Sequence, residues 1–255
     1  MGLQRYIVNF PRLSPGLLEA WRAVPSRVVV DALGCGHAVA PGIRSCAPGT
    51  RLCGQARTVA PMPGDNSVLL AACSFAEPGD VVVVGGAGLE AVAVAGQWVA
   101  RSGKSRGLGG LVIDGAVRDL PEIRGIGFPV FAKGAVPRAP HRAVGGKMDL
   151  PVTVGGVAVS PGDLLVGDDD GVAVVPLLAA EEALRQCQDW MARPIRHPER
   201  QLPERAVAER ALPEGLILEI GAAERPRPAP IEAALPLLTA LARPDPDSFD
   251  HPALR

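Results

Sequence analysis

The chain has 255 residues, of which 47% are hydrophobic and only 4% aromatic, so it can bury a core built mainly from Val, Leu, Ala and Ile. With 26 basic and 27 acidic side chains the net charge is −1, which gives no global electrostatic case for nucleic acid or an anionic membrane as a partner. The longest apolar runs are too short to span a bilayer, and the first residues lack a signal-peptide core, so we expect a cytoplasmic protein with reduced cysteines.

The first part of the chain alternates between helical and extended patterns. Residues 15–33 have helical spacing, whereas residues 34–66 are rich in Gly, Pro and Cys and are expected to form loops and short strands. A helix over about 67–76 leads through a Pro-Gly-Asp turn to four consecutive valines at 81–84. Such a β-branched run is typical of a strand buried on both faces.

A strand–helix–strand unit follows. Small and straight-chain residues over 89–102 predict a helix, and residues 111–113 predict the next buried strand. Two strands joined through a helix favour parallel pairing, so the pattern indicates an α/β fold class. Another short strand is expected at 129–131.

After residue 150 the pattern changes to short strands separated by glycine-rich and aspartate-rich turns. These strands are expected at 152–154, 157–159, 164–166 and 172–175, and a helix at 177–191 follows. Proline is then frequent, with seven between residues 224 and 255. We therefore expect a main domain over 1–192 and a Pro-rich, partly helical extension over 193–255, with 231–241 as its candidate helix and a partly disordered tail as the alternative.

One segment carries the clearest candidate chemistry. Arg118 and Asp119 follow the apolar strand at 111–113, and the carboxyl end of a buried strand is a common place for a site in α/β proteins. Arg118 offers a planar fork that suits a carboxylate, and Asp119 offers a hard oxygen ligand that suits Mg²⁺ or Mn²⁺. An exposed Arg–Asp pair without function is the alternative, and these residues alone favour neither.

Three further patterns have simpler explanations. The glycine-rich loop at 85–88 could offer backbone N–H groups to an anion, but a tight turn explains it. Three consecutive aspartates at 168–170 resemble a calcium loop but lack its spacing, so a charged turn is preferred. The four histidines lie far apart and form no metal-binding pair.

An ordered series of segments resembles a known family. The series includes Gly64-Asp65-Asn66, the stretch 107–137 (GLGGLVIDGAVRDLPEIRGIGFPVFAKGAVP) and residues 166–172. Over residues 28–176, and more weakly to 221, the chain resembles the RraA-like family. That family contains class II pyruvate aldolases acting on 4-hydroxy-4-methyl-2-oxoglutarate and 4-carboxy-4-hydroxy-2-oxoadipate, and the regulator of ribonuclease E activity A (RraA).

The resemblance implies a fold, an assembly and a reaction. It implies a compact α/β/β sandwich of the swivelling-domain type, and a homotrimer or hexamer with sites at subunit interfaces, where the extension could contact a neighbouring subunit. Catalytic members use Mg²⁺ or Mn²⁺ to release pyruvate from a small 2-oxo acid, and many also decarboxylate oxaloacetate. The implied function is therefore a metal-dependent carbon–carbon lyase, with a non-catalytic regulatory or binding protein like RraA as the alternative.

The resemblance also implies roles for individual residues. Asp119 would hold the metal and Arg118 would contact the keto oxygen and carboxylate of the pyruvyl unit. The backbone amides of Trp98 and Val99 would bind the substrate carboxylate. A glutamate from a neighbouring subunit would help to hold the metal, and the candidate for it in this sequence is Glu204.

The chain departs from the family pattern at one position. Catalytic members carry an acidic residue, twenty intervening residues and then Arg-Asp, but Gln97 stands here at the acidic position. RraA regulators instead lose the Asp that follows the Arg, so the chain falls between the two groups. With one carboxylate fewer, a hard cation should bind more weakly. Oxaloacetate decarboxylation should tolerate the change better than the aldol reaction, because only the latter removes a hydroxyl proton. Another alternative is that the protein is a family member that acts on a different 2-oxo acid or β-keto acid.

Overall fold

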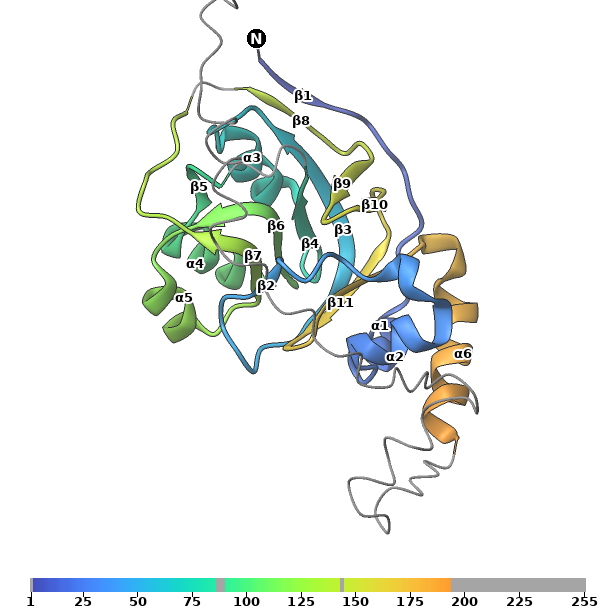
Figure 1. Ribbon diagram of the computed structural model, residues 1–255. Helices are drawn as coiled ribbons and strands as arrows, with labels where there is room; N and C mark the ends of the chain where they lie inside the picture. Colours follow the sequence, from blue (N-terminus) through green and yellow to red (C-terminus); the bar gives the residue numbers. More distant parts are fainter. Residues whose placement is uncertain (1, 86–89, 143–144, 194–255) are drawn as a thin grey trace, which may run out of the picture. The chain divides into compact units, whose positions relative to one another are not determined.

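The computed structural model describes residues 2–85, 90–142 and 145–193, in which a mixed β-sheet is flanked by helices (Figure 1). The strands of the main sheet lie in the order β1 (Leu3–Arg5), β8 (Gly146–Met148), β3 (Leu52–Pro61), β4 (Val81–Val84), β6 (Gly110–Val117), β7 (Val130–Ala135) and β2 (Arg44–Ser45). The pairs β3–β4, β4–β6 and β6–β7 are parallel, so the expected parallel pairing is confirmed.

Shorter strands extend this sheet. β5 (Ala93–Ala95) runs parallel to the end of β6. β11 (Leu164–Asp168) pairs antiparallel with both β3 and β12 (Gly171–Val175). β9 (Val152–Val154) and β10 (Val157–Val159) form a separate antiparallel hairpin.

Helices cover two different parts of the sheet. The helices α3 (Ser67–Phe75), α4 (Gln97–Ser105) and α5 (Leu120–Ile126) lie against the parallel strands (Figure 1). A second group packs on β11 and β12 and comprises α1 (Pro15–Arg22), α2 (Ser26–Leu33) and α6 (Ala180–Ala192). Two 3₁₀ turns, Cys35–His37 and Leu177–Ala179, complete the described elements. The α/β/β sandwich expected from the family resemblance is confirmed.

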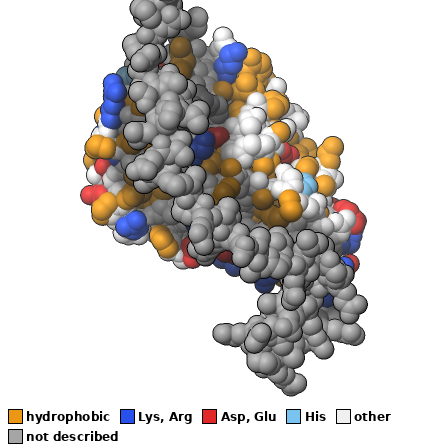
Figure 2. All heavy atoms as spheres, in the orientation of Figure 1, with side chains coloured by type: hydrophobic (Ala, Val, Ile, Leu, Met, Phe, Trp, Pro, Cys, Tyr) orange, Lys and Arg blue, Asp and Glu red, His pale blue; other side chains and the backbone are white. Residues whose placement is uncertain are grey.

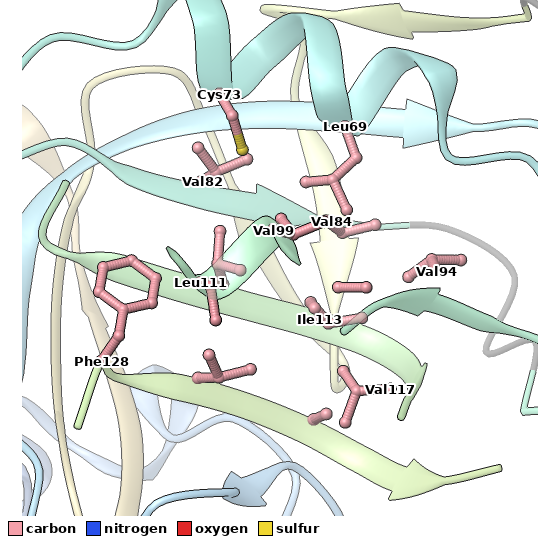
Figure 3. Packing of buried hydrophobic residues seen from close by; sticks show 14 of the residues in the cluster. Leu69, Cys73, Val82, Val84, Val94, Val99, Leu111, Ile113, Val117 and Phe128 are labelled. Atoms are coloured by element: carbon pink, nitrogen blue, oxygen red, sulfur yellow. The ribbon is translucent and has the colours of Figure 1, made fainter. Parts of the chain in front are cut away.

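The four valines of β4 explain how the layers are joined. Val82 and Val84 pack with Leu69 and Cys73 of α3, as Figure 3 shows. Val81 and Val83 belong to the core on the opposite face, together with the β9–β10 hairpin. Because side chains alternate along a strand, an unbroken apolar run buries both faces.

Two sequence predictions were wrong in detail. Residues 34–66 are not only loops and short strands, because β3 is a ten-residue, largely buried strand. Its polar side chains disguised it: Gln55 donates to the carbonyl of Pro11 and accepts from the amide of Leu13, so burying it is not costly. The helix expected from residue 89 begins at Gln97, and β5 occupies part of that range because its small residues fit beside β6.

Other expectations fared better. The helical stretch 15–33 is present as α1 and α2, and the helix expected at 177–191 is present as a 3₁₀ turn followed by α6. The aspartates at 168–170 form the turn between β11 and β12, as expected. The elements β1, β8 and α5 were not predicted. The loop at 86–88 and the extension beyond Arg193, with its candidate helix at 231–241, lie outside the described residues.

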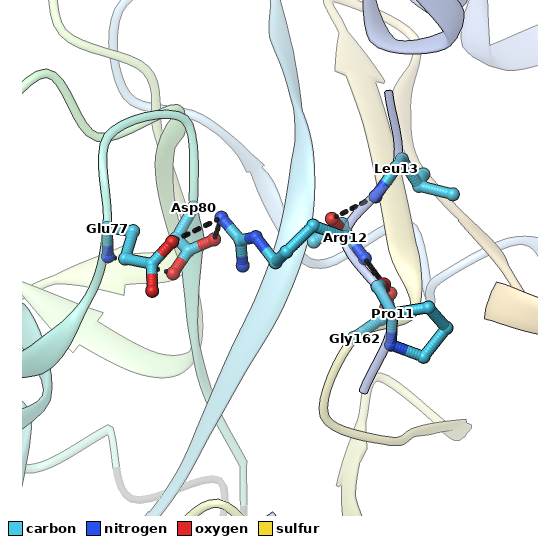
Figure 4. A network of polar contacts seen from close by, with 7 residues as sticks. Pro11, Arg12, Leu13, Glu77, Asp80 and Gly162 are labelled. Atoms are coloured by element: carbon cyan, nitrogen blue, oxygen red, sulfur yellow. Dashed lines mark hydrogen bonds and ion pairs between the residues drawn. The ribbon is translucent and has the colours of Figure 1, made fainter. Parts of the chain in front are cut away.

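The N-terminal segment is attached to the sheet by buried polar groups (Figure 4). Arg12 Nη2 lies 2.6 Å from Oδ1 of Asp80, whose side chain is fully buried and also accepts from the amide of Glu77. Burial raises the pKa of the Asp80 carboxyl, and Arg12 opposes this effect by favouring the charged form. The ion pair therefore anchors the segment before α1 to the turn before β4.

The surface charges and the cysteine thiols are as the sequence leads us to expect. On the described part of the face in Figure 2, basic and acidic side chains are interspersed with hydrophobic ones. All five cysteines are free thiols, and burial raises the pKa of Cys46 and Cys73 to about 11, so these two are packing residues rather than nucleophiles. No helix in the described ranges is long and apolar enough to cross a membrane.

Candidate active site

The end of β6 presents the Arg118–Asp119 pair. The amide of Arg118 donates to the carbonyl of Ala95 at 3.0 Å, which fixes the pair beside the end of β5. Asp119 adopts a left-handed backbone conformation, with φ of 63°, immediately before α5. Aspartate tolerates this region better than most residues, but the conformation still costs about 1 kcal/mol or more. Such strain at the end of a buried strand is typical of functional positions.

The N-terminus of α4 holds one oxygen of Asp119. The amide of Gln97 donates to Asp119 Oδ2 at 3.1 Å, and Arg118 Nε lies 3.8 Å from the same oxygen. The first amides of a helix also carry partial positive charge, which attracts an anionic side chain. In the described chain no hydrogen-bond donor contacts Asp119 Oδ1, and 26% of the side chain is exposed. One oxygen is thus fixed and the other is open to a ligand.

Gly96 makes this arrangement sterically feasible. A Cβ atom at position 96 would lie 2.6 Å from Asp119 Oδ2 and 3.1 Å from Arg118 Cγ. These distances are too short for any other residue unless the acid moves. Gly96 therefore allows the start of α4 to approach the carboxylate closely.

A cavity of about 340 Å³ lies over this pair. Its first wall contains Arg118 and Asp119 and the start of α4 with Trp98 and Val99. The amides of Trp98 and Val99 lie in the first turn, where a helix offers no internal acceptor, so they are available to an anion. The Trp98 side chain is 74% exposed and forms part of the rim.

A second wall comes from the start of α3 and from residues 139–142. The amide of His141 donates to the carbonyl of Gly64, and its carbonyl accepts from the amide of Asn66, so the two segments are joined. Asn66 Nδ2 donates to the carbonyl of Val94 at 3.2 Å, which ties this wall to β5. Asn66 Oδ1 is buried and has no partner among the described residues. Arg142 contributes an exposed guanidinium to the cavity.

The predicted site residues can now be located. One cavity is lined by four of the predicted residues, as a single site requires: Arg118, Asp119, Trp98 and Val99. Gln97 contributes its backbone amide to Asp119, and it is not among the residues that line the cavity. Glu204 lies outside the described residues, so its predicted metal contact stays a prediction.

Sequence reasoning missed part of the cavity. Asn66 belongs to the Gly-Asp-Asn segment that resembles the family, but the segment alone gave it no role. Gly96 was not recognised, because the sequence pattern placed it inside a helix over 89–102, whereas it is the residue directly before α4. Nothing in the sequence marks Arg142, because its position depends on the pairing of 139–142 with the loop before α3.

Comparison with known proteins identifies the family. A family model described as RraA-like, Aldolase/RraA, matches residues 26–174. The chain belongs to the RraA-like family. It is 34% identical over 195 residues to a Halalkalibacterium halodurans protein named "Putative 4-hydroxy-4-methyl-2-oxoglutarate aldolase", an alignment covering 76% of this chain and 90% of that protein.

Solved structures of the RraA-like family support the same fold. Streptomyces coelicolor RraAS2, described as an unusual member of the RNase ES inhibitor RraA protein family, is 32% identical with a TM-score of 0.60 over 70% of this chain and 94% of that one. The RNA-processing inhibitor RraA from Thermus thermophilis is 30% identical with a TM-score of 0.55 over 59% of this chain and 92% of that one. The relatives thus include a protein whose name is that of a putative aldolase and a protein named as an RNA-processing inhibitor.

Proposed function

We propose that this protein is a metal-dependent carbon–carbon lyase that acts on a 2-oxo acid in the cavity over Arg118 and Asp119. One observation supports the proposal most strongly: four groups face the same cavity. They are the Arg118 guanidinium, the Asp119 carboxylate with one open oxygen, and the backbone amides of Trp98 and Val99. Cleavage of a 4-hydroxy-2-oxo acid to pyruvate, or decarboxylation of oxaloacetate, needs each of these groups. The name of the Halalkalibacterium relative supports the same reaction class.

The donor set fits Mg²⁺ or Mn²⁺ with one protein ligand from the described residues. Asp119 Oδ1 is a hard, accessible oxygen, and Mg²⁺ is often held by one or two carboxylates plus substrate and water. No group of three His, Cys, Asp or Glu side chains in the described ranges could hold a metal. We therefore propose Asp119 as a metal ligand and Glu204 of a neighbouring subunit as a second, within a homotrimer or hexamer. When bound, the metal would supply the electron sink for the enolate of pyruvate.

The chain's own residues would orient the substrate and stabilise charge. The amides of Trp98 and Val99 would bind the carboxylate next to the keto group, since both point from the positive end of α4. Arg118 would add positive charge where the enolate oxygen develops, and its planar fork would fix the orientation of the pyruvyl unit. Because the Gln97 amide and Arg118 already hold Asp119 Oδ2, the carboxylate is oriented before the ligand arrives.

A second function remains, and two observations favour it. Gln97 stands where the family resemblance leads us to expect an acid. Of the related solved structures, one is described as an RNA-processing inhibitor and another as an unusual member of the RNase ES inhibitor RraA protein family. A non-catalytic regulatory protein would need the assembled surface but neither Asp119 nor the metal.

One assay separates the two functions. Pyruvate release would be measured from oxaloacetate and from 4-hydroxy-4-methyl-2-oxoglutarate, with Mg²⁺, with Mn²⁺ and with EDTA. We expect metal-dependent release that exceeds the metal-only background and that Arg118→Lys strongly reduces, because an ammonium cannot reproduce the fork. Release equal to that background for both substrates would reject the lyase and favour the regulator.

A further inference from the structure

The cavity holds one positive charge that the proposed reaction at C2 does not use. Among the charged side chains that line it, Arg118 pairs with Asp119 at 3.8 Å, whereas Arg142 has no acidic partner in the described chain. Before any metal binds, the lining therefore has a net charge of about +1, from two arginines and one aspartate. An unpaired guanidinium at the edge of a binding cavity is suited to a carboxylate.

The backbone of residues 138–141 is held in place, and Arg142 directly follows this fixed segment. The amide of Ala93 donates to the carbonyl of Arg138 at 2.9 Å, and the amide of His141 donates to the carbonyl of Gly64 at 2.9 Å. The wall that carries Arg142 is therefore fixed both to β5 and to the loop before α3. It is a different wall from the one formed by Trp98, Val99 and Arg118.

We infer that Arg142 determines specificity by binding a second carboxylate, at the far end of the substrate from the 2-oxo acid group. This inference rests on the proposed use of the cavity by 2-oxo acids. The amides at the start of α4 bind the C1 carboxylate, and Arg142 binds the distal carboxylate, so the substrate spans the two walls. A 2-oxo acid with an uncharged tail leaves Arg142 solvated and binds less tightly.

The test is a comparison of two ligands that the proposed reaction cannot cleave. 2-Oxoglutarate and 2-oxopentanoate have the same number of carbon atoms, but only the former carries a second carboxylate. Calorimetry on the full chain with Mg²⁺ would give both dissociation constants for the parent, Arg142→Met and Arg142→Lys. Arg138→Met is the matched control, because Arg138 is exposed in the same segment and does not line the cavity.

We expect the parent to prefer 2-oxoglutarate by about tenfold, the size of a partly exposed charge-assisted contact. Arg142→Met should abolish the preference by weakening 2-oxoglutarate alone, Arg142→Lys should retain part of it, and Arg138→Met should retain all of it. An absent preference in the parent, or one that survives Arg142→Met, overturns the inference. A preference that depends on Arg142 in a protein that releases no pyruvate rejects the lyase and keeps the inference. Failure of the parent to bind either ligand rejects both.

Discussion

Two aspartates of this protein share a backbone conformation but lie in opposite surroundings. Asp119 and Asp149 are the two non-glycine residues with positive φ in the described ranges, and both have φ of 63°. Asp149 is 1% exposed and lies 2.7 Å from Arg57 Nη2 and 3.3 Å from Arg5 Nε. Asp119 is 26% exposed and lies 3.8 Å from Arg118.

The comparison shows how the same local feature can serve structure or ligand binding. The charge of Asp149 is balanced by two arginines of the protein, and its amide donates to the carbonyl of Thr58, so it joins β3 to the bend that directly follows β8. Asp119 is held only by a helix amide and a distant arginine, so its charge remains available. Strain alone thus does not mark a functional site, whereas strain beside a cavity and incomplete pairing does.

The largest effect should come from removing the charge of Asp119. Asp119→Asn keeps the left-handed backbone and an acceptor for the Gln97 amide, so stability should change by about 1 kcal/mol or less. Metal affinity should become undetectable, and pyruvate release should fall at least about 100-fold, because the metal supplies several kcal/mol of charge stabilisation. Calorimetry with Mn²⁺ and steady-state kinetics measure both, and undiminished metal affinity would show that Asp119 is not a ligand.

The corresponding change at Asp149 should do the reverse. Asp149→Asn leaves Arg57 buried with a neutral partner, and breaking such a buried pair costs about 3 kcal/mol. Urea unfolding should report this loss, while the metal affinity of the folded protein should stay as in the parent. If Asp149→Asn weakened metal binding and left stability unchanged, the distinction between the two aspartates would be wrong.

A smaller effect is expected when Asp119 is displaced rather than replaced. Gly96→Ala introduces a Cβ atom 2.6 Å from Asp119 Oδ2, so the carboxylate has to move. A shift of about 1 Å at a catalytic group can cost up to about 100-fold in rate, and we expect a decrease of between about 10- and 100-fold in kcat. Gly125→Ala is the control, since a Cβ atom at that helical position would have open space around it. Equal kcat values for the two variants would show that Gly96 does not position the acid.

The sequence predicted the fold better than it predicted the cavity, for a physical reason. The strands β4 and β6 could be predicted because their apolar residues are consecutive in the sequence, so the local pattern alone indicates burial. The polar strand β3 was missed because its stability depends on partners such as Pro11 and Asp149, which are distant in the sequence.

The candidate site divides in the same way. Arg118 and Asp119 follow their strand directly and could be predicted. Trp98 and Val99 came only from the family resemblance, because the sequence pattern placed the start of their helix at residue 89 instead of Gln97. Arg142 joins the cavity only through the pairing of its segment with the loop at Gly64, and no local pattern encodes that contact.

The smallest expected effect, and the most informative about chemistry, concerns Gln97. The backbone N–H of Gln97 donates to Asp119 Oδ2, so a change of the side chain leaves that hydrogen bond in place. Gln97→Glu adds one carboxylate, at nearly unchanged side-chain volume, to the residue whose backbone amide holds the proposed metal ligand. Metal binding should tighten by about tenfold, the size of one additional partly exposed charge contact.

The two reactions should respond differently to that charge. Retro-aldol cleavage needs a base for the C4 hydroxyl proton, whereas decarboxylation of oxaloacetate needs only the electron sink. Gln97→Glu should therefore raise pyruvate release from 4-hydroxy-4-methyl-2-oxoglutarate relative to release from oxaloacetate, and Gln97→Ala should not. Both substrates would be measured side by side at saturating Mg²⁺, so that tighter metal binding cannot account for the change in ratio. A ratio that is the same in the parent and both variants would mean that position 97 acts through its backbone amide alone, as a structural partner of Asp119.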